Sequence, residues 1–479
     1  MPPPANRIPI ALFSGSRGII YAQILRLGVR LATAAILARL LTPADYGLQG
    51  MAAAVFGFLY IARDLGLVST LQQARFSHQD LPAACRLGLG GGIMLTVAGV
   101  LLSWPTGRFF HETSTVPLVL AAMSLSFIFA GIAAPALGLL QREGRAAEVA
   151  TAEAVAAAAA GVAAAGTAYL GAGVWSLVAL TLVQEAAACL VAWRMTGATF
   201  SIIKKGGPRR TLATYGTTFA SLQLINHAIQ ILDQVIVARI AGAVALGIYG
   251  RGAQLTALPH QYGIAPFHHW IVAQLGAPEA SGALFRRALN SLLHVSLFSA
   301  ALCVAVPGEL LLLVFGGNWL EAAPVVRGLG IALAFQPWIA APGWIFMARG
   351  ALRPLILSSL AGAAITAAAC LVAAPRGIGE VSQSIAVVSL IRAAAGPIIC
   401  ARDRIVRPED WLAASLVPIA VHAGFAATLL FAKRALGGAG AGWNVAFTAL
   451  VMIPAYYGLL LLVCPPFRRE WKSHLFLTR

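Results

Sequence analysis

Long apolar runs alternate with short polar connections along the whole chain. Most runs have about 20 residues or more, which is the length of a helix that crosses a bilayer. Prolines and glycines fall inside several runs, as membrane helices tolerate. The pattern predicts fourteen spans, at residues 18–40, 46–66, 85–104, 117–140, 146–169, 173–194, 214–240, 246–273, 288–315, 325–347, 355–374, 381–401, 411–432 and 443–464.

Composition excludes an ordinary soluble domain. Hydrophobic residues make up 59% of the 479 residues and charged residues 11%, against about 25% charged in soluble proteins. Lipid favours helices because each backbone N–H and C=O must be paired within its element. The alternation of a membrane β-barrel is absent, so we predict an all-α, multi-pass membrane protein. The start of the chain lacks a cleavage site, so the first span is expected to be its own insertion signal.

The distribution of Lys and Arg predicts the orientation. With the N-terminus in the cytoplasm, 22 of these residues fall on cytoplasmic segments and 8 on the opposite side. This asymmetry follows the positive-inside rule and places both termini in the cytoplasm. It also accounts for most of the +17 net charge. The charges are spread over short loops, so nucleic acid is not an expected partner.

Polar side chains at membrane depth are the strongest functional signal. Gln23, Arg26, Arg30 and Thr33 are spaced 3, 4 and 3 apart on the first span and therefore share one helix face. Arg30 lies about 18 Å inside the span at 1.5 Å per residue, near the bilayer midplane. A charge at that depth faces a wet cavity or a counter-ion. A cationic binding site and a structural ion pair are therefore the two interpretations.

A second copy of this pattern follows 200 residues later. Leu37-Ala38-Arg39-Leu40 corresponds to Val237-Ala238-Arg239-Ile240, and Gly47 and Gly50 correspond to Gly247 and Gly250. The polar face also recurs, because positions 223, 226, 230 and 233 are Gln223, Asn226, Gln230 and Asp233. We interpret this as a duplicated membrane hairpin, cationic in the first copy and neutral to acidic in the second. Repeats with a site at their interface are typical of alternating-access transporters.

Other chemistry-bearing residues give weaker signals. The six cysteines are scattered without CxxC spacing, so disulfides and metal ligands are not expected. His268 and His269 point to different faces of a helix and lack metal-ligand spacing, which leaves their role open. Helix packing is favoured for Glu148, Glu153 and Glu185, and Arg392 is noted near the middle of the twelfth span. No enzymatic motif of the phosphate-loop, nucleophile-elbow or HExxH type occurs, so no catalytic residue or cofactor is predicted.

Two stretches resemble a known family. LARLLTPADYGL followed by ARDLGLVSTLQQ is similar to the start of the bacterial polysaccharide transporters, the O-antigen and exopolysaccharide flippases. DQVIVARIAGAVALGIYGRGAQLTALP resembles the start of that family's second half. The resemblance implies the fold of the multidrug/oligosaccharidyl-lipid/polysaccharide exporters, with two pseudo-symmetric six-helix lobes and two extra helices. The expected segments are 1–195, 196–402 and 403–479.

The resemblance also implies a substrate and its contacts. An oligosaccharide linked to polyprenyl pyrophosphate would move from the cytoplasmic to the periplasmic leaflet of a bacterial inner membrane. Related lipid II flippases carry arginines on spans one, two and eight, which here are Arg26 and Arg30, Arg63, and Arg251. Gln23, Asn226 and Gln230 complete the expected polar lining, although the last two depart from the pattern by carrying no charge. Membrane lipids and other polysaccharide-assembly proteins are the further expected partners.

Energy coupling and the alternatives remain as hypotheses. Asp233 is an isolated intramembrane carboxylate, and no ATP-binding motif is present, so proton or sodium coupling through Asp233 is the economical hypothesis. A permanent pair of Asp233 with Arg239 or Arg251 is its alternative. For the whole protein, the rival functions are an ion-coupled multidrug exporter of the same superfamily, a membrane polysaccharide polymerase or glycosyltransferase, and a structural scaffold.

Overall fold

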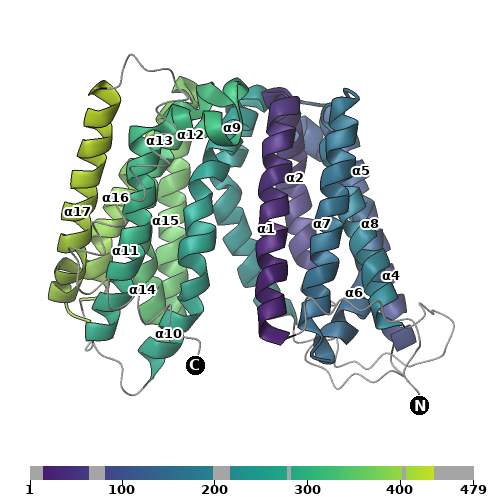
Figure 1. The fold of residues 1–479 in the computed structure, drawn as a ribbon, viewed down its shortest axis with the longest axis horizontal. Coiled ribbons are helices and arrows are strands. Elements are labelled where there is room, and N and C mark those ends of the chain that lie inside the picture. The colour runs from purple at the N-terminus through teal and green to yellow at the C-terminus, as the bar shows by residue number, and fades with distance from the viewer. Residues whose placement is uncertain (1–14, 64–80, 198–215, 278–281, 402–405, 436–479) are drawn as a thin grey trace. The chain divides into compact units, whose positions relative to one another are not determined.

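The computed structural model describes residues 15–63, 81–197, 216–277, 282–401 and 406–435, and those residues contain helices and no strand. Contacts divide the chain into two compact units, Met1–Gly247 and Ile248–Arg479. Figure 1 shows the helices as long, roughly parallel rods within each unit. The all-helical prediction is confirmed, and each unit is described by itself below.

The first unit is built from seven helices and the first part of an eighth. They are α1 (Gly15–Leu40), α2 (Pro43–Arg63), α4 (Leu81–Phe109), α5 (Thr115–Ser124), α6 (Ser126–Arg142), α7 (Ala146–Tyr169), α8 (Trp175–Thr196) and α9 (Gly216–Pro259), which continues into the second unit. Helix α7 packs against α1 and α8, α4 packs against α6, and α2 lies against α4 and α5.

The second unit contains the rest of α9 and the helices that follow it. They are η5 (His260–Ile264), η6 (Ala265–Phe267), α10 (His268–Gly276), α11 (Gly282–Ala305), α12 (Pro307–Val314), η7 (Gly317–Ala322), α13 (Ala323–Ala334), α14 (Gln336–Ala348), α15 (Leu352–Ala373), η8 (Ala374–Arg376), α16 (Ile378–Ile399) and α17 (Pro408–Ala435). Helix α11 packs against α13 and α17, and α16 packs against α13 and α15.

Small residues create the helix contacts of the first unit. Ala152, Ala156, Ala160 and Ala164 recur every four residues on α7, and each is at most 1% exposed. Such a stripe lets neighbouring backbones approach closely in lipid, where apolar side chains gain little by leaving the solvent. Gly88 of α4 and Gly131 of α6 face each other so closely that a Cβ on either would overlap the other's carbonyl oxygen. The alanine-rich segment therefore serves helix packing, beyond any bias in composition.

The predicted turn between the first two spans lies at the start of α2. Thr42 precedes Pro43, the first helical residue, and the backbone N–H of Thr42 donates to the Asp45 carboxylate at 2.9 Å. The backbone N–H of Asp45 donates to the Thr42 hydroxyl at 3.3 Å. This reciprocal arrangement is a capping box with proline at the position it prefers. The threonine, proline and aspartate thus begin the second helix.

The same break recurs 200 residues later inside α9. Gly242, the counterpart of Thr42, has φ +82° and ψ −174°, so the helix is interrupted there. Only glycine adopts this conformation at low cost. The predicted separation of spans 214–240 and 246–273 is confirmed by this kink.

The described residues contain nine helices that are long and apolar enough to cross a membrane, or ten if the bent pair Gly317–Ala334 and Gln336–Ala348 is one span. One of the nine, Gln223–Gly276, runs through the Gly242 kink and covers two predicted spans. Helices α1 and α2 occupy the first two predicted spans but are not among the nine. The predicted span 443–464 lies outside the described residues, so the count of fourteen is not confirmed.

Four predicted spans are irregular within their length. The eighth passes from α9 through η5 and η6 into α10, and three others are divided or bent. The fourth divides at Leu125 into α5 and α6, the ninth at Val306 into α11 and α12, and the tenth bends by 41° near Phe335 between α13 and α14. Prolines follow the last two of these breaks, at Pro307 and Pro337, where a missing N–H and a ring clash disfavour a continuous helix. The chain is therefore less regular than its hydropathy alone predicts.

Candidate functional site

Arg26 and Arg30 lie one turn apart on α1 in different surroundings. Arg26 is half-buried and donates a charge-assisted hydrogen bond to Glu153 of α7. Arg30 is exposed, and no hydrogen bond or ion pair of its side chain occurs within the described part of the chain. The structural ion pair considered for Arg30 is therefore found at Arg26 instead.

Helical geometry explains the difference between neighbours on this face. Successive residues turn by about 100°, which places Thr33 and Arg26 toward one edge of the stripe and Arg30 toward the other. Thr33 packs on α7, where a Cβ at Gly161 would overlap its hydroxyl oxygen. The edge with Arg26 and Thr33 thus meets α7, and Arg30 lies on the uncovered edge. The side chain of Gln23 lies outside the described part of the structure.

Arg63 is the last residue of α2 and is also paired. Its guanidinium donates to Glu185 of α8 at 3.1 Å and lies 3.9 Å from the centre of the Tyr60 ring. The Arg63 and Glu185 side chains are 16% and 15% exposed. A pair so well shielded from solvent interacts more strongly than a surface salt bridge. Arg63 therefore joins α2 to the middle of α8.

Glu153 and Glu185 are the carboxylate partners of Arg26 and Arg63. The helix-packing role expected for both glutamates agrees with the structure, in which each receives an arginine from another helix, but the identity of the partners was not predicted. An isolated carboxylate in an apolar helix indicates a cationic partner, because the charge is costly there unless a cation is near. The pairing itself depends on the packing of α7 against α1 and of α2 against α8, which periodicity does not reveal.

The first part of α9 presents the second polar face. Gln223, Asn226 and Gln230 are exposed, and Asp233 is half-buried. His227, on the neighbouring position, packs edge-on against the Phe58 ring of α2, with 5.0 Å between ring centres. A Cβ at Gly57 would overlap His227 Nε2. The three amides therefore share an uncovered face, and His227 fills the contact with α2.

Two glycines related by the 200-residue offset make reciprocal contacts. A Cβ on Gly47 would overlap the carbonyl oxygen of Ala243, and a Cβ on Gly247 would overlap that of Pro43. Position 43 corresponds to 243, and position 47 to 247, so each copy makes the contact that the other copy makes. Such an exchange of partners is what a two-fold relation produces. The contact supports the hypothesis of a duplicated hairpin.

The second unit contains Arg251, the remaining arginine of the predicted site. Arg251 is half-buried on α9, and its guanidinium carbon lies 5.7 Å from the centre of the Phe315 ring. This distance is within the range of a cation–π contact. The Arg251 side chain is therefore partly buried in the second unit, against an aromatic ring.

Arg392 of α16 is a further intramembrane cation of the second unit. Its guanidinium covers Gly362 of α15 so closely that a Cβ there would lie 2.6 Å from its Nε. Among the described residues it has no hydrogen bond or ion pair. The glycine thus makes room for the arginine between two packed helices.

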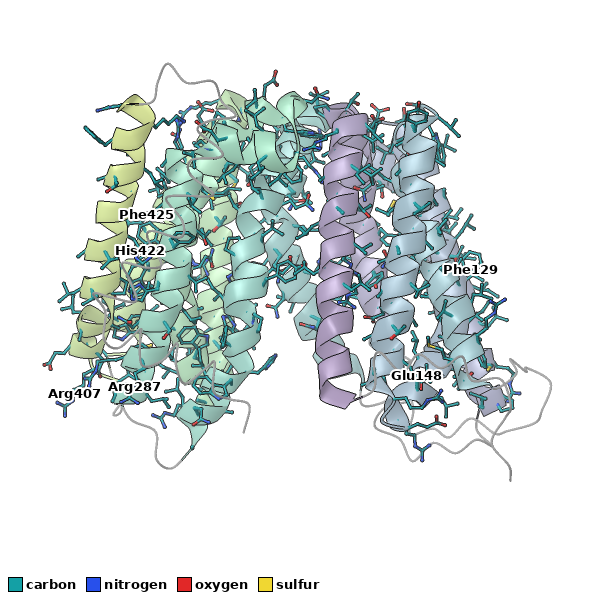
Figure 2. All side chains as sticks on the ribbon, viewed as in Figure 1. Phe129, Glu148, Arg287, Arg407, His422 and Phe425 are labelled. Atoms are coloured by element: carbon teal, nitrogen blue, oxygen red, sulfur yellow. The ribbon has the colours of Figure 1, made fainter. Side chains whose placement is uncertain are left out.

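The histidines lie in aromatic contacts. The ring of His268 lies 5.6 Å from that of Trp344 and 6.2 Å from that of His260, and His269 is exposed. The expectation that His268 and His269 face different surroundings is met. His294 and His422 are buried against each other between α11 and α17, with ring centres 5.1 Å apart. His422 is labelled on α17 in Figure 2. Within the described residues no group of three or more His, Cys, Asp or Glu is suited to a metal ion.

A charge cluster at the start of α7 provides a contrast. Arg145, between α6 and α7, donates to Glu148 at 2.5 and 2.7 Å, to Glu143 at 2.8 Å and to the carbonyl of Met195 at 2.6 Å. The hydrogen bonds with Glu148 raise the pKa of Arg145 above its ordinary value. This cluster ties the start of α7 to the end of α8 and does not involve the predicted site residues.

Comparison with known proteins decides the family. The profile of a family described as "Polysaccharide biosynthesis protein" matches residues 36–324, more than half of the chain. The chain belongs to this family. It is also 23% identical over 253 residues to the lipopolysaccharide biosynthesis protein WzxC of Escherichia coli strain K12, a match that covers 51% of this chain and 50% of that protein. The matched region is thus about half the length of that relative.

Solved structures agree on the fold. The lipid II flippase MurJ, in an inward closed conformation, superposes with a TM-score of 0.69 at 12% identity, covering 96% of this chain and 99% of MurJ. An inward-facing multidrug resistance transporter of the MATE family and MOP superfamily gives a TM-score of 0.60 at 15% identity, covering 78% and 96%. The resemblance to the polysaccharide transporters is confirmed, and the protein is a multi-pass membrane protein with the MurJ and MATE fold.

Proposed function

We propose that this protein is a flippase for oligosaccharides linked to polyprenyl pyrophosphate, working by alternating access in a bacterial inner membrane. The observation that carries the proposal is Arg30, an exposed arginine on an apolar helix with no acidic partner among the described residues. Family membership and the flippase fold support a lipid-linked substrate. No covalent step is required, and the protein needs only two states open to opposite sides.

The chemistry of the first unit suits a diphosphate. Guanidinium groups bind phosphate oxygens in a bidentate manner and keep their charge. Arg26, Arg30 and Arg63 are three such groups, all at least partly accessible to solvent. The polyprenyl tail would remain in lipid and the sugars would follow the head group. Gln23, Asn226, Gln230 and Arg251 are the proposed further contacts, and Asp233 is the proposed ion-coupling residue.

The orientation is part of this proposal. Both termini are cytoplasmic, and the segments near Glu112 and Glu321 are periplasmic, as the 22 to 8 charge bias indicates. Reporter fusions at these two positions test the arrangement, because cytoplasmic signals at both would contradict it. The proposed lobes, 1–195 and 196–402, and the C-terminal helices 403–479 belong to the same arrangement.

The decisive experiment combines a deletion strain with variants of α1. Deletion should cause lipid-linked oligosaccharide to accumulate on the cytoplasmic side, and the parent gene should relieve it. Arg30→Ala should fail to relieve it at normal protein levels, and Arg30→Lys should restore part of the export. Arg39→Ala, an exposed arginine near the end of the same helix, is the matched control. Normal export by Arg30→Ala would refute the proposed cationic site.

An ion-coupled multidrug exporter is the second candidate, because the MATE fold also matches. The two functions differ in the charge of the ligand that the first unit would favour. A deletion strain that gains drug sensitivity without accumulating lipid-linked sugar would favour the exporter.

A further inference from the structure

Two ion pairs in the first unit occupy arginines of the proposed site. Arg26 of α1 is paired with Glu153 of α7, and Arg63 of α2 with Glu185 of α8. Each pair joins a helix of the arginine-bearing hairpin, α1 and α2, to a helix of the hairpin formed by α7 and α8. Glu153 is seven residues into α7, and Glu185 lies at the middle of α8. Both carboxylates are therefore within helices of membrane-spanning length.

A charge within such a helix is stabilised by a counter-ion or by water. Separating the Arg63–Glu185 pair, whose side chains are 16% and 15% exposed, leaves two uncompensated charges in surroundings of low polarity, which is strongly unfavourable. The Arg26–Glu153 pair, with side chains 25% and 41% exposed, is separated at a smaller cost. Arg26 and Arg63 can leave their carboxylates at acceptable cost only when another anion replaces them. The proposed substrate brings that anion, because its diphosphate offers several acceptor oxygens.

The carboxylate and the diphosphate compete for the same donors. A guanidinium presents its N–H groups as a planar fork that matches either anion. In the pair of Arg63, one nitrogen donates to Glu185 at 3.1 Å. An incoming phosphate that takes this donor must displace the glutamate. Arg30, which has no carboxylate within the described residues, is available before either exchange.

We propose that Glu153 and Glu185 are exchangeable resident anions of the substrate site. They hold Arg26 and Arg63 when the site is empty, and the diphosphate displaces them after it has met Arg30. The inference rests on the proposed function and extends it, since it assigns to the two glutamates the control of affinity and release. Their return to the arginines expels the head group.

The exchange also links substrate binding to helix contacts. Each displaced glutamate removes one cross-helix bond, between α1 and α7 or between α2 and α8. Substrate binding therefore loosens two helix pairs that the empty protein holds together. This supplies the differential interaction that a ligand needs to shift an equilibrium between two states.

Binding of a polyprenyl diphosphate without sugar to the purified full-length chain tests the exchange. Glu153→Gln and Glu185→Gln keep the size and one acceptor of the side chain but remove the competing charge. Each variant should bind the diphosphate about tenfold more tightly than the parent, as expected when a charge-assisted bond no longer competes. Each should also release it more slowly. The uncharged polyprenol should bind all variants alike.

Glu148→Gln is the matched control. Glu148, labelled in Figure 2, lies in the first turn of the same helix α7 and accepts hydrogen bonds from Arg145, which precedes the helix. This variant should bind the diphosphate like the parent. Unchanged or weaker binding by both site variants would overturn the exchange, and the two glutamates would then be structural ties. If a glutamine variant does not fold, Glu153→Asp or Glu185→Asp replaces it and must bind more tightly than the parent, because a shorter acid reaches the arginine less well.

The same measurement separates this inference from the proposed function. If the parent binds the diphosphate no better than the polyprenol, the proposed function fails and the exchange fails with it. If the parent binds it and Arg30→Ala does not, while both glutamine variants match the parent, the proposed function stands and the exchange is refuted.

Discussion

Helix α1 and the first part of α9 have the same polar spacing and different charge. Arg30 and Gln230 occupy corresponding positions, and both are exposed. Arg26 corresponds to Asn226, but Arg26 is half-buried in an ion pair and Asn226 is exposed. The two helices thus share the register of their polar positions, and they share exposure at positions 30 and 230, but they do not share charge. The comparison teaches that the copies share the spacing of their polar positions, while the positive charge of this face belongs to α1.

Exchanging the two residues tests the difference between the helices most directly. Arg30→Gln gives α1 the residue of α9 and should lower export by about a hundredfold or more, since it removes charge-assisted hydrogen bonds to the diphosphate that are worth about 1.5–3 kcal/mol each. Export in the deletion strain and binding of polyprenyl diphosphate measure the loss. Adding Gln230→Arg should not restore it, because the charge would then lie on a different helix. Full rescue by the double variant would show that the copies are interchangeable.

The glycine contact tests whether the copies are structurally equivalent. Gly47→Ala and Gly247→Ala each place a methyl group on a carbonyl of the other copy and should each destabilise the fold by about 1–3 kcal/mol. Thermal unfolding in detergent measures this. Gly28→Ala on α1 is the control, because no atom lies within 4 Å of its added Cβ. Unequal effects of the two site variants would argue against equivalent contacts.

Asp233 is the residue through which we propose that the second copy couples transport to an ion gradient. It replaces Thr33, which packs on Gly161. Asp233→Asn in reconstituted vesicles should leave diphosphate binding unchanged and remove the response of transport to an imposed proton or sodium gradient, because the amide has no titrating charge. An Asn variant that responds like the parent would exclude Asp233 as the coupling residue.

The smallest effect is expected at Asn226. An exposed amide contributes one neutral hydrogen bond of about 0.5–1.5 kcal/mol, so Asn226→Ala should lower export by about threefold. The matched variant in α1, Arg26→Ala, should have a larger effect because it also strands Glu153. Initial rates in vesicles provide the comparison. Equal losses at the two positions would show that charge is not what distinguishes the helices.

Sequence patterns predicted the structural features that depend on neighbouring residues and on the 200-residue repeat. The helical class, the capped start of α2 and the break at Gly242 all follow from residue type and from the repeat. Pro307 and Pro337 could also have indicated the breaks before them. The break at Leu125 has no proline beside it, so no local signal was available.

The side-chain pairs between helices could not be predicted from the sequence. The polar face of α1 was predictable from spacing, but its division between Arg26 and Arg30 depends on which edge α7 covers. Likewise, nothing near Glu185 in the sequence points to Arg63, which lies 122 residues away. Such contacts are properties of the packed helices, and a periodic pattern contains no information on neighbours.

The reciprocal contact of Gly47 and Gly247 bears on ancestry. If the two copies descend from one gene that encoded half the chain, two molecules of that ancestor would have paired through a single glycine acting twice. Any substitution there would have harmed both sides of the pair at once. Fusion made the positions separately mutable, yet each still lies against the main chain of the other copy. Descendants of such a fusion should therefore lose arginines from one copy more readily than they lose either glycine.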